Sequence, residues 1–563
     1  MKKVLALLLA AMMILSIIPM ATAESTDSVG VFEADGYTYG EKFWSDEPVT
    51  YTIFFSDASW YPMVDTWKTE GVFEQIRKAT NVTLDITSYD SNDYMSLVAL
   101  DLGTDRCAYI IPKVYDESGW VDGGAILPVS DYVDKMPNFT WFYNTYNLKA
   151  DLDTILRADN KFYRLPGMHQ AALQDYTLMV RDDIFAAAGY DVKELEKTWT
   201  WNDLCDILIG VKKYMVENGM CEESDYIWSD LWCGQSGQGS GGYLCKLVGN
   251  SYDVASGWAV GNGLRFDFDK DQWYLSSTSE NFKEFVTVMH RLVAEGILDP
   301  ETFVQDDSVA NDKFFTGKSV IQGFNRSQLV TWMDGLNKGL GEGNYSVYIT
   351  VYPAGTNNYV AENTRLENGV CISKGALEAL GEEGFIKMMR FVDWMFYSDE
   401  GYILTKWGPE GETWEYAEEN GVKIKKLLPG FKCGGLGIAG SDEDVDIRLK
   451  WGYGCGNYFY AHANALRGDN LPAVIQDYDI RYAEYRDQMP LSPATVLTPE
   501  EIESTGLIQA DLIANINAWT IQFITGQKDI EADWDAYVQS CEEYEAEELV
   551  KTYNDAYIRT KGE

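Results

Sequence analysis

The sequence predicts an α/β fold in which helices outnumber strands. A strand-like run at 49–55 is followed by a helical pattern with apolar residues at 72, 73, 76 and 79. An alternating apolar and polar run at 82–86 then predicts a second strand. A strand, a helix and a strand within about forty residues are typical of the βαβ unit of a parallel sheet.

The later elements are mostly helical. Residues 107–111 predict one more buried strand. A helix over 203–217 has an apolar face, and Thr200 or Asn202 is suited to cap its start. The run Ser277–Glu280 resembles a capping box, and the helix that follows should end at Gly296. An apolar stripe over 512–523 predicts a long helix near the end of the chain, so the fold class is α/β with helices in excess.

The first 23 residues have the features of a secretory signal peptide. Lys2 and Lys3 precede an apolar run over 4–20, and the small-residue triplet Ala21–Ala23 provides a cleavage site. As a membrane anchor the run would be short, because a bilayer span needs about 20 residues. Residues 24–48 are polar and predict a flexible leader. We therefore expect an exported, soluble protein with two large domains or more.

Composition excludes several classes of function. The formal net charge of −43 disfavours nucleic acid and anionic lipid as partners. The three His residues are far apart in the sequence, which argues against a zinc site or a His-based catalytic pair. Nine Cys leave at least one thiol unpaired, and pairing within 205–245 or between Cys433 and Cys455 stays open. The acidic run Asp267–Asp271 is interpreted as a hairpin turn and not as a metal site.

Several segments, in a common order, resemble the large extracellular solute-binding proteins of carbohydrate ABC importers. No single segment is specific, but their order along the chain is. These segments are Asp122–Val129, Lys161–Pro166, Leu178–Asp183, Trp199–Leu204, Glu295–Pro300, Phe315–Val320, Phe523–Gly526, Asp533–Tyr537 and Tyr553–Tyr557.

The resemblance implies a two-lobed type II periplasmic-binding-protein fold with the ligand cleft between the lobes. Lobe 1 would comprise 49–165 and 351–405, and lobe 2 would comprise 166–350 and 406–563. It also implies a monomer that needs no cofactor, binds an oligosaccharide and delivers it to the membrane subunits of an ABC permease. Hinge closure on the ligand would be the mechanism.

The sequence departs from this pattern in two places. Many relatives have a Cys at the cleavage site for lipid attachment, whereas Ala23 and Glu24 stand here, so lipid anchoring is not expected. Some relatives hold calcium in a loop after the segment that matches Trp199–Leu204. The corresponding run here, 217–225, lacks the alternating oxygen ligands that a calcium ion needs, so no metal is predicted.

Aromatic residues in turns are the first candidates for a sugar site, because sugars stack their C–H faces on rings. Asp57, Trp60 and Tyr61 follow the first strand, and Trp120 follows a later one. The carboxyl ends of strands are where open α/β sheets place ligands. For each of these aromatic residues, local packing is the alternative interpretation.

Further candidates lie later in the chain. Trp201, Trp394, Trp519 and Trp534 fall in helical patterns and are predicted to be core residues. Trp407 is a candidate because Trp407–Gly411 resembles the segment that re-enters the cleft in the same family. The remaining site candidates are aromatic residues in glycine-containing loops and two polar residues, namely Trp232, Trp451, Tyr453, Arg181 and Asn325.

The function predicted from these features is an exported solute-binding receptor that captures an oligosaccharide, with a neutral sugar favoured by the acidic charge. Two alternatives stay open. One is an exported glycosidase that uses two carboxylates, although 88 acidic residues make any such pair uninformative. The other is a receptor of the same fold for a peptide or a polyol, because a fold does not determine its ligand.

Overall fold

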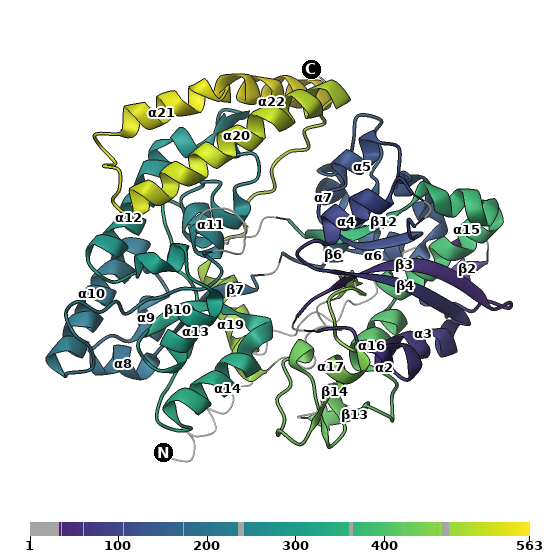
Figure 1. Cartoon of the computed structure of the whole chain (residues 1–563), viewed down its shortest axis with the longest axis horizontal. Helices are drawn as coiled ribbons and strands as arrows, with labels where there is room; N and C mark the ends of the chain where they lie inside the picture. Colours follow the sequence, from purple (N-terminus) through teal and green to yellow (C-terminus); the bar gives the residue numbers. More distant parts are fainter. Residues whose placement is uncertain are drawn as a thin grey trace, which may run out of the picture.

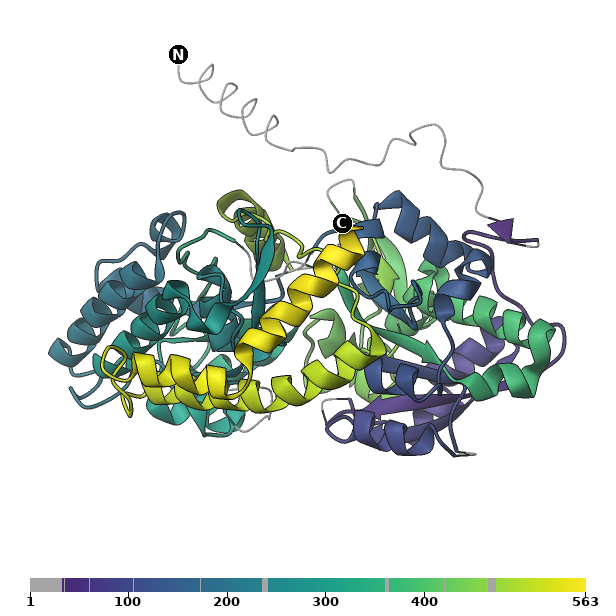
Figure 2. The same ribbon diagram turned by 90° about the horizontal axis from the view of Figure 1, so that it is seen from above.

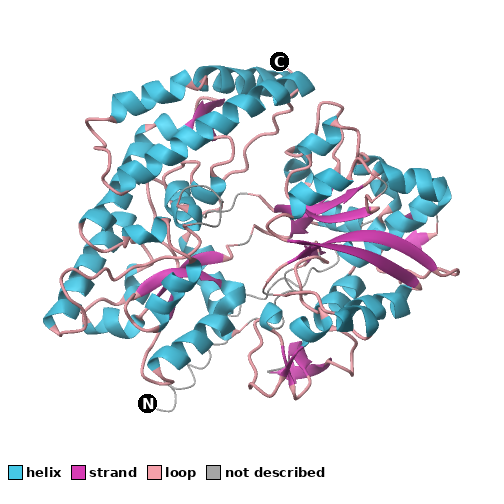
Figure 3. Cartoon of the chain, in the orientation of Figure 1, coloured by secondary structure: helices cyan, strands magenta, loops and turns pink. Residues whose placement is uncertain are grey.

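The chain forms two lobes that lie side by side (Figure 1). The computed structural model describes residues 33–34, 36–59, 61–104, 106–172, 174–234, 241–359, 364–419, 422–458, 460–463 and 472–562. Helices surround the main sheet of each lobe (Figure 3), so the predicted helix-rich α/β class is confirmed.

Lobe 1 is built on a six-stranded sheet with the strand order β17-β6-β12-β5-β3-β4. All strands run in one direction except β12, which is antiparallel to both of its neighbours. The strands are β3 Val49–Asp57, β4 Val82–Asp90, β5 Ile110–Val114, β6 Arg164–His169, β12 Leu366–Ile372 and β17 Ala461–His462. The predicted strands at 49–55 and 82–86 correspond to β3 and β4, and the strand predicted at 107–111 begins three residues later.

Helices pack on this sheet through their apolar faces. In α3, Val72, Phe73 and Ile76 are buried on one side of the helix, which is the spacing that the sequence predicts. The helices of lobe 1 are α2 Asp65–Thr69, α3 Val72–Thr80, α4 Tyr94–Asp101, α5 Ser118–Asp122, α6 Pro137–Thr145, α7 Lys149–Asp153, α15 Lys374–Tyr397, α16 Asp399–Trp407 and α17 Ile447–Trp451. A hairpin of β13 Trp414–Glu419 and β14 Val422–Leu427 extends from the same lobe.

Lobe 2 has a smaller sheet in which β7 Tyr176–Val180 lies between β10 Ile321–Asn325 and β11 Tyr348–Thr350, antiparallel to both. The hairpin predicted at 267–271 joins β8 Leu264–Asp267 to β9 Gln272–Leu275. The larger helices of this lobe are α8 Asp182–Ala187, α10 Trp201–Glu217, α11 Gly242–Ser251, α12 Glu280–Ala294, α13 Asp307–Phe315, α14 Leu329–Leu340, α19 Ala473–Tyr485, α20 Pro499–Ile524, α21 Trp534–Glu543 and α22 Ala546–Lys561.

Two helix starts in lobe 2 test the capping predictions. Thr200 caps α10, because its hydroxyl accepts from the Asp203 N–H while the Asp203 carboxylate accepts from the Thr200 N–H. The cap of α12 is Ser279 and not Ser277, since Ser276–Thr278 forms a 3₁₀ turn before the helix. The sequence therefore located both helices, but it placed the N-cap of α12 two residues too early.

The chain crosses between the lobes three times. It leaves lobe 1 after β6, returns between β11 and β12, and leaves again between β17 and α19. The first crossing lies between His169 and Tyr176 and the second between Thr350 and Leu366, whereas the resemblance placed the boundaries after residues 165 and 350. The third was predicted near 405 and instead follows residue 463. Trp414, Tyr453 and Tyr460 pack in the same core as β3 and β5, so residues 406–463 belong to lobe 1.

The predicted flexible leader at 24–48 differs from the structure over 36–48, which we call the N-terminal strap. Phe43 is only 5% exposed in the core of lobe 1, and Tyr39 stacks on Trp141 of α6 with ring centroids 4.2 Å apart. Lys42 forms an ion pair with Glu400 of α16. Figure 2 shows β2 Tyr37–Thr38 against this lobe. The polar composition of residues 24–48 did not indicate that Tyr39 and Phe43 would attach this segment to lobe 1. The predicted signal peptide at 1–23 lies outside the described residues.

Candidate functional site

All three crossings leave or enter lobe 1 at one edge of its sheet. Because β3, β4, β5, β6 and β17 run in the same direction, their carboxyl ends meet at this edge. β6 and β17 lead from it into crossings, and β12 begins there after a crossing. The edge therefore faces lobe 2, and it is the side on which open α/β sheets place ligands.

Lys113 stands at this edge in a strained conformation. Ile111 of β5 pairs with Cys371 of β12, and Val114 pairs with Gly369. Two residues of β5 therefore lie opposite the single residue Val370, which makes a bulge in β5. Lys113 has a φ of 61°, which costs a residue with a side chain roughly 1–2 kcal/mol. Its N–H donates to the Tyr460 hydroxyl at 2.9 Å, which holds the bulge. Bulges of this kind redirect a side chain next to a functional site.

The Lys113 ammonium forms no ion pair with the residues that the structure describes. Burial lowers its pKa, but the nearby Tyr115, Tyr61 and Glu367 outweigh this, and the net effect raises the pKa above that of a free lysine. Among the described residues, no carboxylate lies within 4.0 Å of its Nζ. The ammonium lies 5.9 Å from the ring centroid of Tyr115, whose side chain is 65% exposed. A protonated donor and an open ring thus stand together at the end of β5.

A second strained residue, Trp232, belongs to lobe 2. Its φ is 58°, which is rare for so bulky a residue, and its N–H donates to the Asp307 carboxylate at 2.6 Å. Its ring packs edge-on against Tyr176 and Tyr243, with both centroid distances 5.4 Å, and lies 6.3 Å from Trp258. Tyr176 begins β7 directly after the first crossing, so this aromatic group borders the edge of lobe 2 that faces lobe 1.

Trp258 adds an unsatisfied donor to this group. Its indole N–H is buried and has no hydrogen-bond acceptor among the residues that the structure describes. A buried donor without a partner costs about 1–3 kcal/mol, and functional sites are one place where such a cost is tolerated.

The carboxyl end of β10 brings charged groups to the same edge of lobe 2. Asn325 caps the following turn by accepting from the Ser327 N–H, and Arg326 forms ion pairs with Asp175 at 3.4 Å and Asp479 at 2.6 Å. This turn, η5 Arg326–Gln328, approaches η6 Gly434–Leu436 of lobe 1 with Cα atoms within 8 Å. The two lobes therefore meet at one side of their facing edges.

The predicted candidates at the end of β3 lie at the lobe 1 edge. Asp57 is the last residue of β3 and accepts from the Met63 N–H at 2.9 Å. The side chain of Tyr61 is buried beside Lys113. Trp60 lies outside the described residues. These assignments stay predictions, as do those of Trp232 and Asn325 at the lobe 2 edge.

Four other candidates are held in a core or in an ion pair instead of facing the strand ends. Trp407 has no exposed surface and packs on Trp414, and Tyr453 is buried in the same core. Trp120 is nearly buried in α5, inside a second core of lobe 1. Arg181 is ion-paired with Asp183 at the end of β7 that is remote from the crossing.

Trp451, at the end of α17, is partly exposed and packs on Phe431 with a centroid distance of 5.6 Å. The structure thus places Trp407, Tyr453 and Trp120 in the cores of lobe 1 and Arg181 at the far end of β7, and the assignment of Trp451 to the site stays a prediction.

Lys113, Tyr115 and Trp258 were not predicted from the sequence. A signal for the first two exists: Pro112 interrupts the apolar run Ile110–Val114, and proline inside a central strand indicates a bulge. Trp258 has no comparable signal, because its neighbours in space come from distant parts of the chain.

The described residues contain no group of three or more His, Cys, Asp or Glu side chains placed to hold a metal ion. None of the helices that the structure describes combines the length and the apolar character needed to cross a bilayer. All nine cysteines are free thiols.

Comparison with known proteins identifies relatives of one kind. No protein-family profile matches the chain. A fructooligosaccharide ABC transporter substrate-binding protein of Streptococcus pneumoniae, FusA, is 22% identical over 512 residues, which cover 87% of this chain and 88% of FusA.

Solved structures of solute-binding proteins are also similar to this chain. FusA in complex with kestose superposes with a TM-score of 0.65 at 17% identity, covering 91% of this chain and 99% of that structure. A human-milk-oligosaccharide (HMO) binding, ABC-transporter-associated solute-binding protein of Bifidobacterium longum infantis gives a TM-score of 0.65 at 13% identity, with the same coverage. The alginate-binding protein AlgQ2 gives 0.64 at 14% identity, covering 92% and 99%.

These matches span both lobes and nearly the whole of each solved chain, and they confirm the predicted resemblance. The chain has the two-lobed α/β fold of the extracellular solute-binding proteins of carbohydrate ABC importers.

Proposed function

We propose that this protein is an exported receptor that captures an oligosaccharide between its lobes and delivers it to an ABC permease. The observation that carries the proposal is the pair of strained residues on facing edges, Lys113 at the carboxyl end of β5 and Trp232 beside the first crossing. Strain of this kind persists where the surroundings enforce it, and it is concentrated at ligand clamps.

The chemistry of the two edges is complementary to a sugar. Tyr115 and the Trp232 group supply ring faces for C–H stacking, and the Lys113 ammonium and the Asp57 carboxylate supply hydrogen bonds to hydroxyls. The names of the relatives FusA and AlgQ2 refer to fructooligosaccharide and alginate, which supports a saccharide ligand here.

Closure follows from how the groups are divided between lobes. A ligand that contacts Tyr115 and Trp232 together stabilises only the state in which the edges approach, so binding shifts the hinge equilibrium toward it. Secretion through the signal peptide, a monomeric state and recognition of the closed form by the permease belong to the same proposal. The relatives are substrate-binding proteins, and the receptor accordingly needs no catalytic group.

Calorimetry with a panel of neutral and acidic oligosaccharides tests the function. We expect one-site binding to at least one member, with no release of reducing ends during incubation. Steady formation of shorter sugars would instead support the glycosidase alternative, and binding only to peptides or polyols would contradict a saccharide ligand.

Replacing Tyr115 with alanine tests the site. The side chain is mostly exposed, so we expect unchanged stability and a ligand affinity that falls by roughly 10- to 100-fold, the effect of losing one stacked ring. Tyr544→Ala is the matched control, because Tyr544 is also exposed but lies at the end of α21 in lobe 2. Equal affinities of the two variants would remove Tyr115 and the end of β5 from the site.

A further inference from the structure

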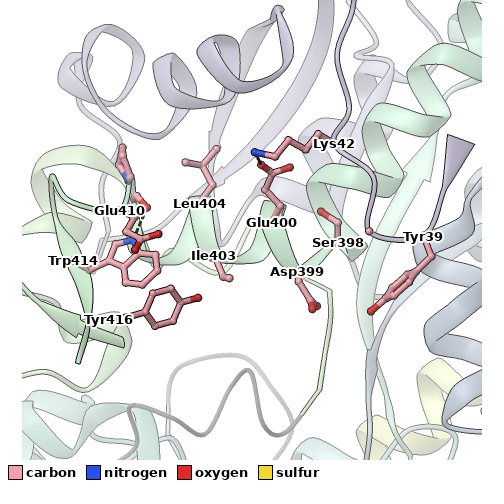
Figure 4. Close-up of a pocket in the computed structure, with 13 residues that line it drawn as sticks. Tyr39, Lys42, Ser398, Asp399, Glu400, Ile403, Leu404, Glu410, Trp414 and Tyr416 are labelled. Carbon is pink, nitrogen blue, oxygen red and sulfur yellow. Dashed lines mark hydrogen bonds and ion pairs between the residues drawn. The ribbon is translucent and has the colours of Figure 1, made fainter. Parts of the chain in front are cut away.

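Lobe 1 contains a hollow of about 510 Å³ (Figure 4), and none of its described lining residues belongs to the six-stranded sheet. Its walls come from three segments that are distant in sequence: the N-terminal strap, the start of α16 and the β13–β14 hairpin with the turn before it. All of its described lining residues belong to lobe 1.

The floor of the hollow is apolar and its sides are aromatic. Ile403 and Leu404 of α16 form the floor, Tyr39 closes one end, and Trp414 and Tyr416 close the other. The Tyr416 ring already binds an ammonium group on one face, since Lys423 Nζ lies 3.6 Å from its centroid. Aromatic rings beside an apolar floor are the surroundings in which alkylammonium groups bind.

The rim of the hollow carries more negative than positive charge. Lys42 is neutralised by Glu400 at 2.8 Å, which leaves the carboxylates of Asp399 and Glu410. Within the part of the chain that the structure describes, Asp399 accepts no hydrogen bond and forms no ion pair within 4.0 Å. Burial raises its pKa above the usual aspartate value, and Lys425 of β14 opposes this only in part. Among the described residues, the charge of the Asp399 carboxylate is therefore stabilised only by the more distant Lys425 and not by a cation in direct contact.

We propose that this hollow is a second binding site, which takes a small alkylammonium cation with its charge on Asp399 and its alkyl groups against Tyr39 and the floor. This site is independent of the oligosaccharide proposal, because none of its residues lies at the strand ends.

Choline and its neutral isostere 3,3-dimethylbutan-1-ol test the charge requirement, with affinities measured by ligand-observed NMR titration of the full chain. We expect choline to bind, and to bind at least tenfold more tightly than the neutral alcohol. Choline affinity should also rise between pH 4 and pH 7, because Asp399 must lose its proton. The groups that face Asp399 are Glu400 of α16, Lys425 of β14, Tyr39 of the strap and Tyr146, which follows α6.

Two variants test the location. Asp399→Asn should weaken choline binding by about tenfold, and Tyr39→Leu should weaken it without any change of charge. Asp182→Asn is the matched control, because Asp182 is likewise the first residue of a helix, α8 in lobe 2. Thermal melts verify that each variant folds.

The proposal is overturned if choline does not bind, if the alcohol binds equally well, or if Asp399→Asn and Asp182→Asn bind choline with the same affinity. Oligosaccharide affinity of Asp399→Asn should equal that of the unmodified protein. If choline does not bind, the receptor function is therefore unaffected. If no oligosaccharide binds, the alkylammonium site can still be tested by itself.

Discussion

Replacing Trp407 with alanine is expected to lower the free energy of unfolding by about 3–5 kcal/mol and to leave oligosaccharide affinity unchanged. The ring is completely buried at the end of α16, where it packs on Trp414 inside the lobe 1 core. Its removal leaves a cavity that the surrounding helix and hairpin can fill only in part. Urea denaturation followed by circular dichroism measures the loss.

Trp44→Ala is the control, because that ring is 57% exposed and its removal should change stability by less than about 0.5 kcal/mol. A variant of Trp407 that keeps its stability but loses ligand affinity would restore the interpretation made from the sequence, in which this ring contacts the sugar.

Replacing Arg481 with methionine is expected to destabilise the protein by about 3–5 kcal/mol, because it leaves a buried carboxylate without its cation. Glu196 has a fully buried side chain that accepts from Arg481, from the Tyr348 hydroxyl at 2.7 Å and from the Val351 N–H at 2.7 Å. Arg481 lies on α19, and Glu196 directly follows α9 Val192–Leu195, so the pair fastens α19 to the end of α9. The Tyr348 hydroxyl on Glu196 and the Ile349 carbonyl, which accepts from Arg481, connect the pair to β11.

The sign of the pH dependence distinguishes this mechanism from a simple packing defect. Burial raises the pKa of Glu196 in the folded protein, and Arg481 is one of the groups that oppose the rise. Without Arg481 the folded-state pKa rises further above the unfolded value, so stability is lost as pH increases. The destabilisation should therefore be larger at pH 8 than at pH 4.

The double variant Glu196→Gln/Arg481→Met should recover part of the loss, because no uncompensated charge stays buried. Arg77→Met is the control, since Arg77 pairs with Glu74 on the exposed surface of α3 and such pairs contribute little. A loss that is the same at both pH values, or no recovery in the double variant, would contradict the buried-charge mechanism.

The fold was predictable where local pattern and tertiary structure agree. The alternation in β4, the apolar face of α3 and the Thr200 cap of α10 are all set by residues close in sequence. The third crossing was placed wrongly because residues 406–463 carry no sequence signal for the lobe they join. Their place is set by packing of Trp414 and Tyr460 against distant strands.

The candidate site was predictable only in part. Asp57 follows a strand that the sequence reveals, so its place at the sheet edge could be inferred. Trp407 was predicted from the family resemblance and Tyr453 from its neighbouring glycines, but neither signal distinguishes a ring that lines a cleft from one that folds into a core, where both rings lie. Lys113 could not be recognised as a site residue from the sequence alone. Its position is central only because β5 lies in the middle of the sheet, and the sequence does not reveal that strand order.

The division of the chain between the lobes also determines the order in which they can mature during synthesis. Lobe 1 has its last strand once residue 462 has emerged, whereas the hydrophobic interior of lobe 2 includes Leu512, Phe523 and Leu549 of the final helices. A nascent chain that stops within α20 would therefore hold one finished lobe and one with its interior open to water. Recognition of damaged or incomplete chains by proteases should begin at lobe 2.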